Sequence, residues 1–277
     1  SLHRRKRTMA AAEESGERTP LVATSLENDI GTVTLNNSKK HNAISAALIA
    51  DLLEAGQKLN ASGVKVVILR AAPGVKVWSA GHDVNELPTN GRDPLTYDDP
   101  LRQVVRAIHE TRMPVVAMVE GSVWGGACEV VMACDIVVAA EGASFAITPA
   151  KLGVPYDIVG VLTFMQRVGL PILKEMLFTA QPISARRAVD VGLVNQVVPG
   201  EHLEEATMAL AQQIARNSPL VISLLKEQLR VLSESTPLNP NTFARIQSLR
   251  RQIYDSADYQ EGIRSFFERR PPQFHGR

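Results

Sequence analysis

Short strands that alternate with helices and tight glycine turns are the strongest constraint on this 277-residue chain. Residues 64–69 are rich in β-branched side chains, as expected of a strand buried on both faces. A helix predicted at 101–111 precedes a strand at 115–119, and a helix that starts at Gly125-Gly126 precedes a strand at 136–140. Strand–helix–strand units of this kind join parallel strands by right-handed crossovers. The sequence therefore predicts an α/β fold.

Further elements extend this pattern at the amino-terminal side. Residues 21–26 and 30–35 are predicted strands that form a hairpin around Asn28-Asp29. Ser45 is a suitable cap for the next helix, in which leucines recur at helical spacing. The segment 87–100 is rich in Pro, Gly and Asp, and we expect it to be a mobile loop.

From about Asp157 the pattern is helical to the end, with the last helices predicted at 220–234, 240–254 and 259–269. We expect three parts in the chain: a disordered leader at 1–20, a core at 21–200 and a C-terminal helical region at 201–277.

Composition excludes several classes of protein. Thirty Lys and Arg residues against 29 Asp and Glu give a formal charge of +1, which argues against a general nucleic-acid or membrane-surface binder. No apolar run approaches the roughly 20 residues needed to span a bilayer. The histidines are scattered, so no metal site is predicted, and Cys128 and Cys134 are expected to be reduced core thiols. The acidic leader lacks an apolar signal segment, which favours the cytoplasm.

Two small-residue turns carry the chemistry that the sequence suggests. The first, within 77–84, places His82 directly after Ala80 and Gly81, and the second, within 124–129, contains Gly125 and Gly126. Small residues let a ligand approach backbone N–H groups closely. Two such turns can direct two N–H groups at one oxygen atom, which is the requirement for an oxyanion hole.

In order and spacing, these turns and their surroundings resemble the enoyl-CoA hydratase/isomerase (crotonase) family over residues 21–276. The matching segments are Lys40–Ile44, Ser79–Asp83, Gly121–Glu129, Cys134–Ile136 and Phe266–Pro271. The resemblance implies a spiral of repeated ββα units, with C-terminal helices that complete the site and form a trimer or a dimer of trimers. It also implies an acyl-CoA thioester as substrate, with no cofactor beyond the coenzyme A of that substrate. By the family pattern, the N–H groups of His82 and Gly126 form the oxyanion hole.

The carboxylates that the family uses to add water are incomplete here. Glu129 matches one of them, but Pro149 stands where the second is expected, and proline cannot transfer a proton. Further on, Val154-Pro155-Tyr156 places a phenol in the same region. Together with matches at 86–103 and 254–262, this arrangement resembles bacterial members of the family that decarboxylate methylmalonyl-CoA to propionyl-CoA and CO₂.

The resemblance assigns a role to each candidate residue. His82, Gly126 and Tyr156 are the expected catalytic residues, with Tyr156 orienting the leaving carboxylate and Thr148 assisting. The His82 ring holds the carboxylate or a water, or assists reprotonation. Glu129 is expected to pair with Arg102 rather than act as the main acid or base. Expected substrate-binding residues are Ala80, Gly81, His82, Asp83, Val84, Gly126, Thr148 and Arg269, with Lys40, Ala43 and Trp124 as further candidates.

Other readings stay open at this point. The chain could be an enoyl-CoA isomerase or hydratase that uses Glu129 alone, or a decarboxylase of ethylmalonyl- or malonyl-CoA. A third class is a non-catalytic scaffold or RNA-binding relative, which the balanced charge and the retained turns disfavour.

Overall fold

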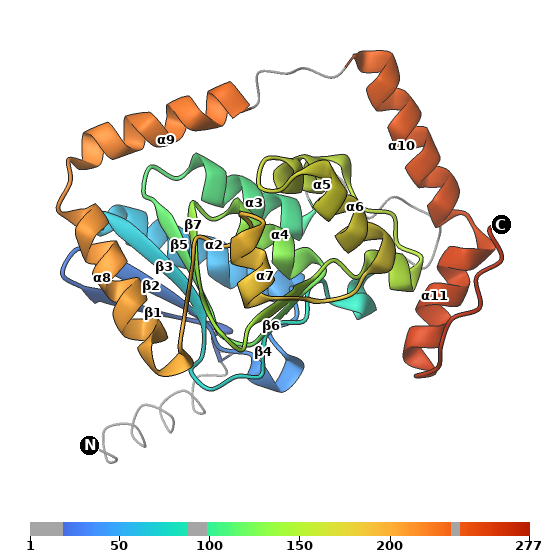
Figure 1. Ribbon diagram of the computed structural model, residues 1–277, viewed down its shortest axis with the longest axis horizontal. Helices are drawn as coiled ribbons and strands as arrows, with labels where there is room; N and C mark the ends of the chain where they lie inside the picture. Colours follow the sequence, from blue (N-terminus) through green and yellow to red (C-terminus); the bar gives the residue numbers. More distant parts are fainter. Residues whose placement is uncertain (1–18, 88–98, 234–238) are drawn as a thin grey trace.

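The structure is a computed structural model that describes residues 19–87, 99–233 and 239–277 (Figure 1). The predicted leader at 1–20 and the predicted mobile loop at 87–100 fall almost wholly outside the described residues.

A six-stranded sheet, in the order β1-β2-β3-β5-β7-β10, forms the base of the fold. Its strands are β1 (Val22–Glu27), β2 (Ile30–Leu35), β3 (Val66–Ala71), β5 (Val115–Val119), β7 (Ile136–Ala140) and β10 (Gln196–Val198). The hairpin β1–β2 is antiparallel and the strands from β2 to β7 pair in parallel, as the sequence predicted, and β10 adds a further parallel strand. Asn28 and Asp29 turn the hairpin with positive φ angles of 47° and 66°, a conformation that these side chains tolerate.

Helices cover both faces of this sheet, which explains why β3 is buried along its whole length. Val67 and Leu69 pack with residues of α2 (Ala46–Ala61) and α3 (Pro100–Glu110), whereas Val66 and Ile68 pack with residues of α8 (Leu203–Ala215). Ser45 caps α2 as predicted, because its hydroxyl accepts from the Leu48 N–H at 3.2 Å.

A second, smaller sheet lies beside the first, in the order β4-β6-β8-β9. Its strands are β4 (Val77–Ser79), β6 (Ser122–Trp124), β8 (Ser144–Ala146) and β9 (Ile183–Ser184). Each of β3, β5 and β7 is followed by a strand of this sheet, which gives the repeated unit of the expected spiral. The sequence prediction missed β6, β8, β9 and β10, and the region after Asp157 is not wholly helical. These strands have only two or three residues, too few for periodicity to reveal.

The remaining helices connect the sheets and close the carboxyl-terminal side. They are α4 (Gly126–Ala133), α5 (Ile158–Met165), α6 (Leu170–Thr179), α7 (Ala185–Asp190), α9 (Pro219–Ser233), α10 (Pro240–Tyr254) and α11 (Ala257–Phe267). Short 3₁₀ turns occur at Ser38–Lys40, Val84–Glu86, Pro149–Leu152 and Gly200–His202. In Figure 1, α9 lies above one side of the core, and α10 and α11 lie at the other side.

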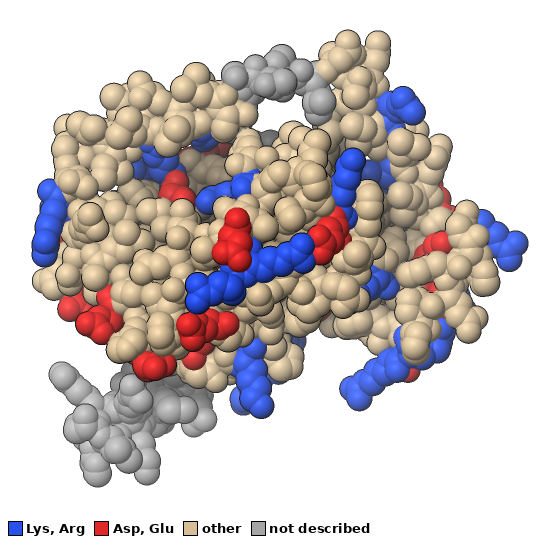
Figure 2. All heavy atoms as spheres, viewed as in Figure 1, with Lys and Arg blue, Asp and Glu red and all other residues tan. Residues whose placement is uncertain are grey.

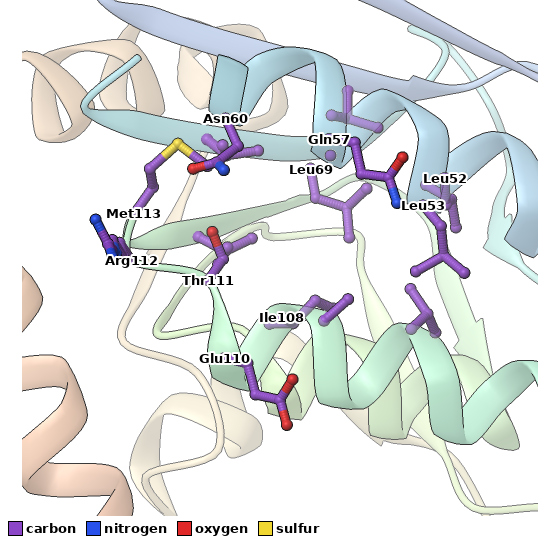
Figure 3. Close-up of a pocket in the computed structure, with 16 residues that line it drawn as sticks. Leu52, Leu53, Gln57, Asn60, Leu69, Ile108, Glu110, Thr111, Arg112 and Met113 are labelled. Atoms are coloured by element: carbon purple, nitrogen blue, oxygen red, sulfur yellow. The ribbon is translucent and has the colours of Figure 1, made fainter. Parts of the chain in front are cut away.

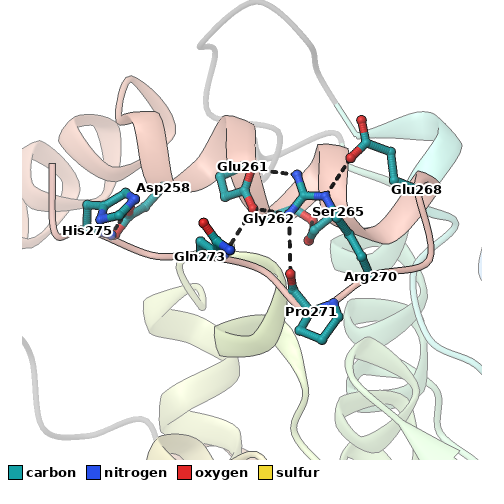
Figure 4. A network of polar contacts seen from close by, with 9 residues as sticks. All are labelled: Asp258, Glu261, Gly262, Ser265, Glu268, Arg270, Pro271, Gln273 and His275. Atoms are coloured by element: carbon teal, nitrogen blue, oxygen red, sulfur yellow. Dashed lines mark hydrogen bonds and ion pairs between the residues drawn. The ribbon is translucent and has the colours of Figure 1, made fainter.

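The C-terminal tail is held along α11 by a group of ion pairs and hydrogen bonds (Figure 4). Arg270 contacts Glu261 through both terminal nitrogens and contacts Glu268 through Nε. The Gln273 N–H donates to Glu261 Oε1 at 3.0 Å, and the His275 N–H donates to Asp258 at 2.7 Å. Hydrogen bonds from Arg270 and from the Gln273 N–H lower the pKa of Glu261 to about 2.

We predict that this attachment of the tail weakens in acid. Because the pKa of Glu261 is lowered from 4.5 to about 2 by folding, its contribution is complete above pH 4.5 and is lost as the pH falls toward 2. Amide hydrogen exchange at Gln273, corrected for the intrinsic rate, should accelerate over that interval. The variant Glu261→Gln should exchange quickly at every pH, whereas Glu175→Gln, in an exposed ion pair elsewhere, should behave like wild type. Normal protection in Glu261→Gln would contradict this account.

Candidate active site

The turn that carries His82 is fixed by backbone hydrogen bonds on both sides. The Ile44 N–H donates to the Gly81 carbonyl at 2.8 Å, and the Asp83 N–H donates to the Ile44 carbonyl at 3.0 Å. These bonds form an isolated parallel bridge between Ile44 and His82. The backbone of His82 is therefore held at a defined position at the end of β4.

The second turn packs directly against the first. A methyl group on Gly81 would overlap the Trp124 carbonyl oxygen and would lie 3.1 Å from the Gly126 nitrogen. A methyl group on Gly126 would lie 3.7 Å from the His82 nitrogen. Gly81 also has a φ angle of +82°, which favours glycine. The two turns can approach so closely only because Gly81 has no side chain.

Two backbone donors are left unpaired where these turns meet. Within the described part of the chain, neither the N–H of His82 nor that of Gly126 has a hydrogen-bond acceptor. Gly126 is the first residue of α4, where N–H groups have no partner within the helix. Most backbone donors in folded proteins are paired. Two adjacent unpaired donors therefore indicate a site for an oxygen atom that carries negative charge.

The loop around Lys40 borders the same turn. The Ala80 N–H donates to the His41 carbonyl at 2.8 Å, and the Ala43 N–H donates to the Lys40 carbonyl at 3.0 Å. Asn42 is fully buried and donates through Nδ2 to the Trp78 carbonyl at 2.8 Å. The predicted residues Lys40 and Ala43 thus lie close to the turn at 80–84, with the Lys40 side chain exposed.

A buried network of charged and polar side chains lies behind the two turns. Arg102 of α3 forms the expected ion pair with Glu129 of α4, and its Nη1 also lies 3.5 Å from Asp157 Oδ2. Arg250 of α10 contacts Asp157 Oδ1 at 3.4 Å. The Tyr156 hydroxyl donates to Glu129 Oε2 at 3.1 Å. Positive and negative charges alternate along this network, so that no charged member lacks a counterion.

Burial controls the protonation of these groups. Burial raises the pKa of Glu129, and the charge of Arg102 opposes that rise. Burial lowers the pKa of Arg102, but Glu129 and Asp157 outweigh it, so the pKa rises overall and the guanidinium stays charged. Burial, together with the nearby Glu129, raises the pKa of Tyr156 well above its ordinary value. Tyr156 therefore keeps its proton and acts as a hydrogen-bond donor.

The His82 ring provides a further polar group at the site. Its Nδ1 atom is buried and, among the described residues, has no hydrogen-bond partner. Asp99, the cap of α3, lies close enough for its charge to interact with His82: burial raises the pKa of Asp99, and His82 opposes that rise. An unpaired ring nitrogen inside the site can form a hydrogen bond with a polar group of a ligand.

The structure brings most predicted residues together. The Thr148 hydroxyl oxygen lies 3.1 Å from the position of a methyl group on Gly125, and Trp124 is half-buried in β6 beside the same turn. Asp83 caps the 3₁₀ turn that includes Val84. Arg269 is different: it is exposed after the end of α11, and in the described part of this chain no hydrogen bond or ion pair joins it to the two turns.

Sequence reasoning missed Asp157, Arg250 and Asp99 as members of the site. Asp99 precedes Pro100, and an Asp-Pro pair is a recognisable signal for a helix start. Asp157 is adjacent to Tyr156, but nothing in the sequence indicated which charges it would meet. Arg250 is one of several arginines on its helix, and only the fold identifies it.

A separate cavity of about 560 Å³ opens between α2 and α3 (Figure 3). Its walls are mainly apolar, with Leu52 and Leu53 from α2 and Ile108 from α3, and none of its residues belongs to the two turns.

Over residues 19–87, 99–233 and 239–277, no group of three or more His, Cys, Asp or Glu side chains is placed to bind a metal ion. In the same ranges, no helix is long and apolar enough to cross a membrane. Cys128 and Cys134 are free and buried, and burial raises the pKa of each thiol to about 12.

Comparisons with known proteins agree with this geometry. The model of the enoyl-CoA hydratase/isomerase family matches residues 25–277. Methylmalonyl-CoA decarboxylase of Escherichia coli (strain K12) is 49% identical over 249 residues, which cover 90% of this chain and 95% of that protein. A structure of methylmalonyl-CoA decarboxylase in complex with 2-nitronate-propionyl-CoA has a TM-score of 0.92 and 47% identity, and covers 94% of this chain and all of that one. A complex with 2S-carboxypropyl-CoA gives the same values.

We predict that Asp157 is essential for the stability of the buried network. Asp157→Asn leaves Arg102 and Arg250 with one negative charge fewer between them, and breaking a buried ion pair costs about 3–5 kcal/mol. Urea denaturation should show a loss of that order in the free energy of unfolding. Glu54→Gln breaks an exposed pair with Lys58 and should change it by less than about 1 kcal/mol. Equal stabilities of the two variants would contradict the prediction.

Proposed function

The chain belongs to the enoyl-CoA hydratase/isomerase family, and we propose that it decarboxylates methylmalonyl-CoA to propionyl-CoA and CO₂. The observation that carries this proposal is the pair of unpaired N–H groups at His82 and Gly126, where the two glycine turns meet. They are suited to hold the thioester oxygen of the substrate. The decarboxylation needs one such pair of donors, because its negative charge develops on a single oxygen atom.

The reaction breaks the bond between the α-carbon and the carboxylate. Its electron pair moves into the thioester carbonyl and gives an enolate, while the carboxylate leaves as CO₂; a proton then adds to the α-carbon. The negative charge of the enolate falls on the oxygen beside the two N–H groups. Removing one donor of this kind costs about 10²–10³ in rate, so these donors account for a large share of the acceleration.

Tyr156 is proposed to orient the leaving carboxylate. The bond that breaks has to stand perpendicular to the thioester plane, and a hydrogen bond to the carboxylate favours that geometry. In this structure the Tyr156 hydroxyl donates to Glu129, which makes the substrate carboxylate a competing acceptor for the same proton. Arg102 neutralises Glu129 and so weakens its hold on the hydroxyl. Release of neutral CO₂ returns the hydroxyl to Glu129.

The His82 ring and Thr148 complete the proposed site. The buried Nδ1 of His82 has no partner among the described residues and can form a hydrogen bond with the substrate carboxylate or with a water. It can also help to deliver the proton that the α-carbon finally receives. Thr148 lies against the Gly125 turn and directly precedes Pro149, the residue at the expected position of the second carboxylate.

Decarboxylation fits the residues better than hydration does. Pro149, the first residue of a 3₁₀ turn, stands where the water-adding relatives are expected to carry a second carboxylate. The remaining carboxylate, Glu129, is 1% exposed and is held by Arg102 and Tyr156. A Glu129 that is paired in this way is poorly placed to activate water, which also disfavours an isomerase that would depend on it alone.

The coenzyme A part of the substrate is proposed to bind along residues 80–84, with support from Lys40 and Ala43. Trp124 then forms a wall of the acyl pocket, and Arg269 is proposed to meet the CoA phosphates. No cofactor beyond the substrate is proposed, because the oxyanion hole and the hydrogen bonds to the carboxylate supply what the reaction needs. Two free, buried thiols support a cytoplasmic location.

A homo-oligomer, either a trimer or a dimer of trimers, is the proposed assembly. Helix α9 has no buried residue and exposes Leu220, Val221, Leu224, Leu225, Leu229, Val231 and Leu232. Figure 2 shows few charged side chains along this helix. Large exposed apolar patches are rare on monomers and mark interaction surfaces. We also propose that residues 201–277 act as one region that completes both the site and this assembly, with support from the contact of Arg250 with Asp157.

The proposed reaction predicts a specific pattern of activity. The wild-type protein should release CO₂ from methylmalonyl-CoA and should not hydrate crotonyl-CoA, each measured separately. Tyr156→Phe removes a hydrogen bond to a charged group and should lower kcat by about 10- to 100-fold, with KM close to that of wild type.

Hydration without CO₂ release would overturn the proposed function. Unchanged kcat in Tyr156→Phe, in a wild-type protein that does decarboxylate, would overturn only the role of Tyr156. Ethylmalonyl-CoA and malonyl-CoA as parallel substrates measure the size limit of the acyl pocket.

The proposed assembly predicts the effect of a charge on α9. Leu229→Glu places a carboxylate in the apolar face and should produce smaller species than the trimer or hexamer of wild type, measured by size-exclusion chromatography with light scattering. Gln228→Glu adds the same charge at the neighbouring polar position and should leave the mass unchanged. A monomeric wild-type protein, or an unchanged Leu229→Glu, would contradict the prediction.

A further inference from the structure

We propose that Gly160 is a positioning residue of the reaction: the absence of a side chain at this position keeps the Tyr156 hydroxyl and the Glu129 carboxylate together. This inference rests on the proposed function, because it is there that the Tyr156 hydroxyl acquires a role.

The space beside Gly160 is occupied by these two groups. A methyl group on Gly160 would overlap the ring carbon Cε1 of Tyr156 and would lie 2.6 Å from Glu129 Oε2. Both distances are shorter than real Cβ contacts, so the two groups could keep their places only if the helix α5 itself shifted. Glu129 Oε2 is the acceptor of the 3.1 Å hydrogen bond. Tyr156 Cε1 is bonded to the ring carbon that carries the donating hydroxyl.

Neither neighbour can move without changing the site. The Tyr156 ring packs edge-on against Phe164, with 5.9 Å between the ring centroids. The Glu129 side chain is 1% exposed and its other oxygen contacts Arg102, which in turn contacts Asp157. A displaced ring would carry the hydroxyl away from the substrate, and a displaced carboxylate would disturb the whole buried network.

Helix formation alone gives no reason for a glycine here. Gly160 lies within α5, where alanine is intrinsically more favourable than glycine. Gly56 in α2 is a useful contrast, because a methyl group there would meet nothing within 4 Å. The same substitution at the two sites therefore gives the same gain in helix propensity and differs only in what the new methyl group meets.

The experiment compares Gly160→Ala with Gly56→Ala in the assay with methylmalonyl-CoA. Gly160→Ala should lower kcat by about 10- to 100-fold, as expected when reacting groups are displaced by about 1 Å, with KM close to wild type since residues 80–84 are untouched. Gly56→Ala should keep wild-type kcat and KM. The double variant Tyr156→Phe/Gly160→Ala should lose less kcat than the product of the two single losses, since the hydroxyl that Gly160 positions is already absent.

Two results would overturn the role of Gly160 while leaving the proposed function intact. One is a wild-type kcat in Gly160→Ala. The other is a kcat for the double variant that equals the product of the two single losses, because Gly160 would then act independently of the Tyr156 hydroxyl.

Inactivity of the wild-type protein would refute the proposed function instead. In that case a crystal structure of Gly160→Ala still decides the steric part. A separation of Tyr156 Oη and Glu129 Oε2 beyond hydrogen-bond range supports it, and an unchanged 3.1 Å contact overturns it.

If Gly160→Ala does not fold, Tyr156→Ala/Gly160→Ala replaces it, because that pair removes the ring that the methyl group would meet and so opens space into which the Glu129 carboxylate can shift. Stability equal to that of Tyr156→Ala supports the steric contact. Failure of the double variant to fold, while Tyr156→Ala folds, overturns the proposal.

Discussion

The close approach of the turns at Gly81 and Gly126 is the constraint on which the rest of the site depends. A side chain at position 81 would overlap the carbonyl of Trp124 and would crowd the nitrogen of Gly126, so the two N–H groups converge only because Gly81 has none. The two sheets make this contact possible: β4 and β6 pair in parallel and deliver both turns from the same side. The proposed oxyanion donors are therefore backbone atoms, fixed by strand pairing before any side chain is considered.

In the proposed function, the buried charges behind the turns favour one reaction over another. Four buried charges alternate from Glu129 through Arg102 and Asp157 to Arg250. Burying ion pairs gives little net stability, since desolvation offsets the attraction. Instead, the arrangement balances the charge of Glu129 with that of Arg102 and keeps its two oxygens in contact with Arg102 and Tyr156. A substrate with its own carboxylate can approach such a group without the repulsion that a free carboxylate would exert.

The sequence predicted those features that local patterns encode. The strands at 115–119 and 136–140, the Ser45 cap and the two glycine turns are each specified by neighbouring residues. The pairing of Arg102 with Glu129 was also predicted, because the family pattern placed Glu129 close to the reacting atoms. Asp157 and Arg250 were not predicted, because their contact joins distant segments and depends on how α10 packs. Gly160 follows no sequence pattern at all, and its importance is visible only from the atoms around it.

These long-range contacts also bear on how the core and the C-terminal region relate. Lys226 of α9 donates to the carbonyls of Ile108 and Met113, where α3 ends, and pairs with Asp135. Gly262 of α11 lies so close to the Leu152 carbonyl that a methyl group would overlap it. Arg250 of α10 supplies the last charge of the buried network. Helices α9, α10 and α11 therefore each contribute a contact next to an element that carries the proposed site: α3, Asp157 and the turn at Pro149–Leu152. A core without this region would have to bury Asp157 with one cation fewer, which would weaken the hold of Arg102 on Glu129.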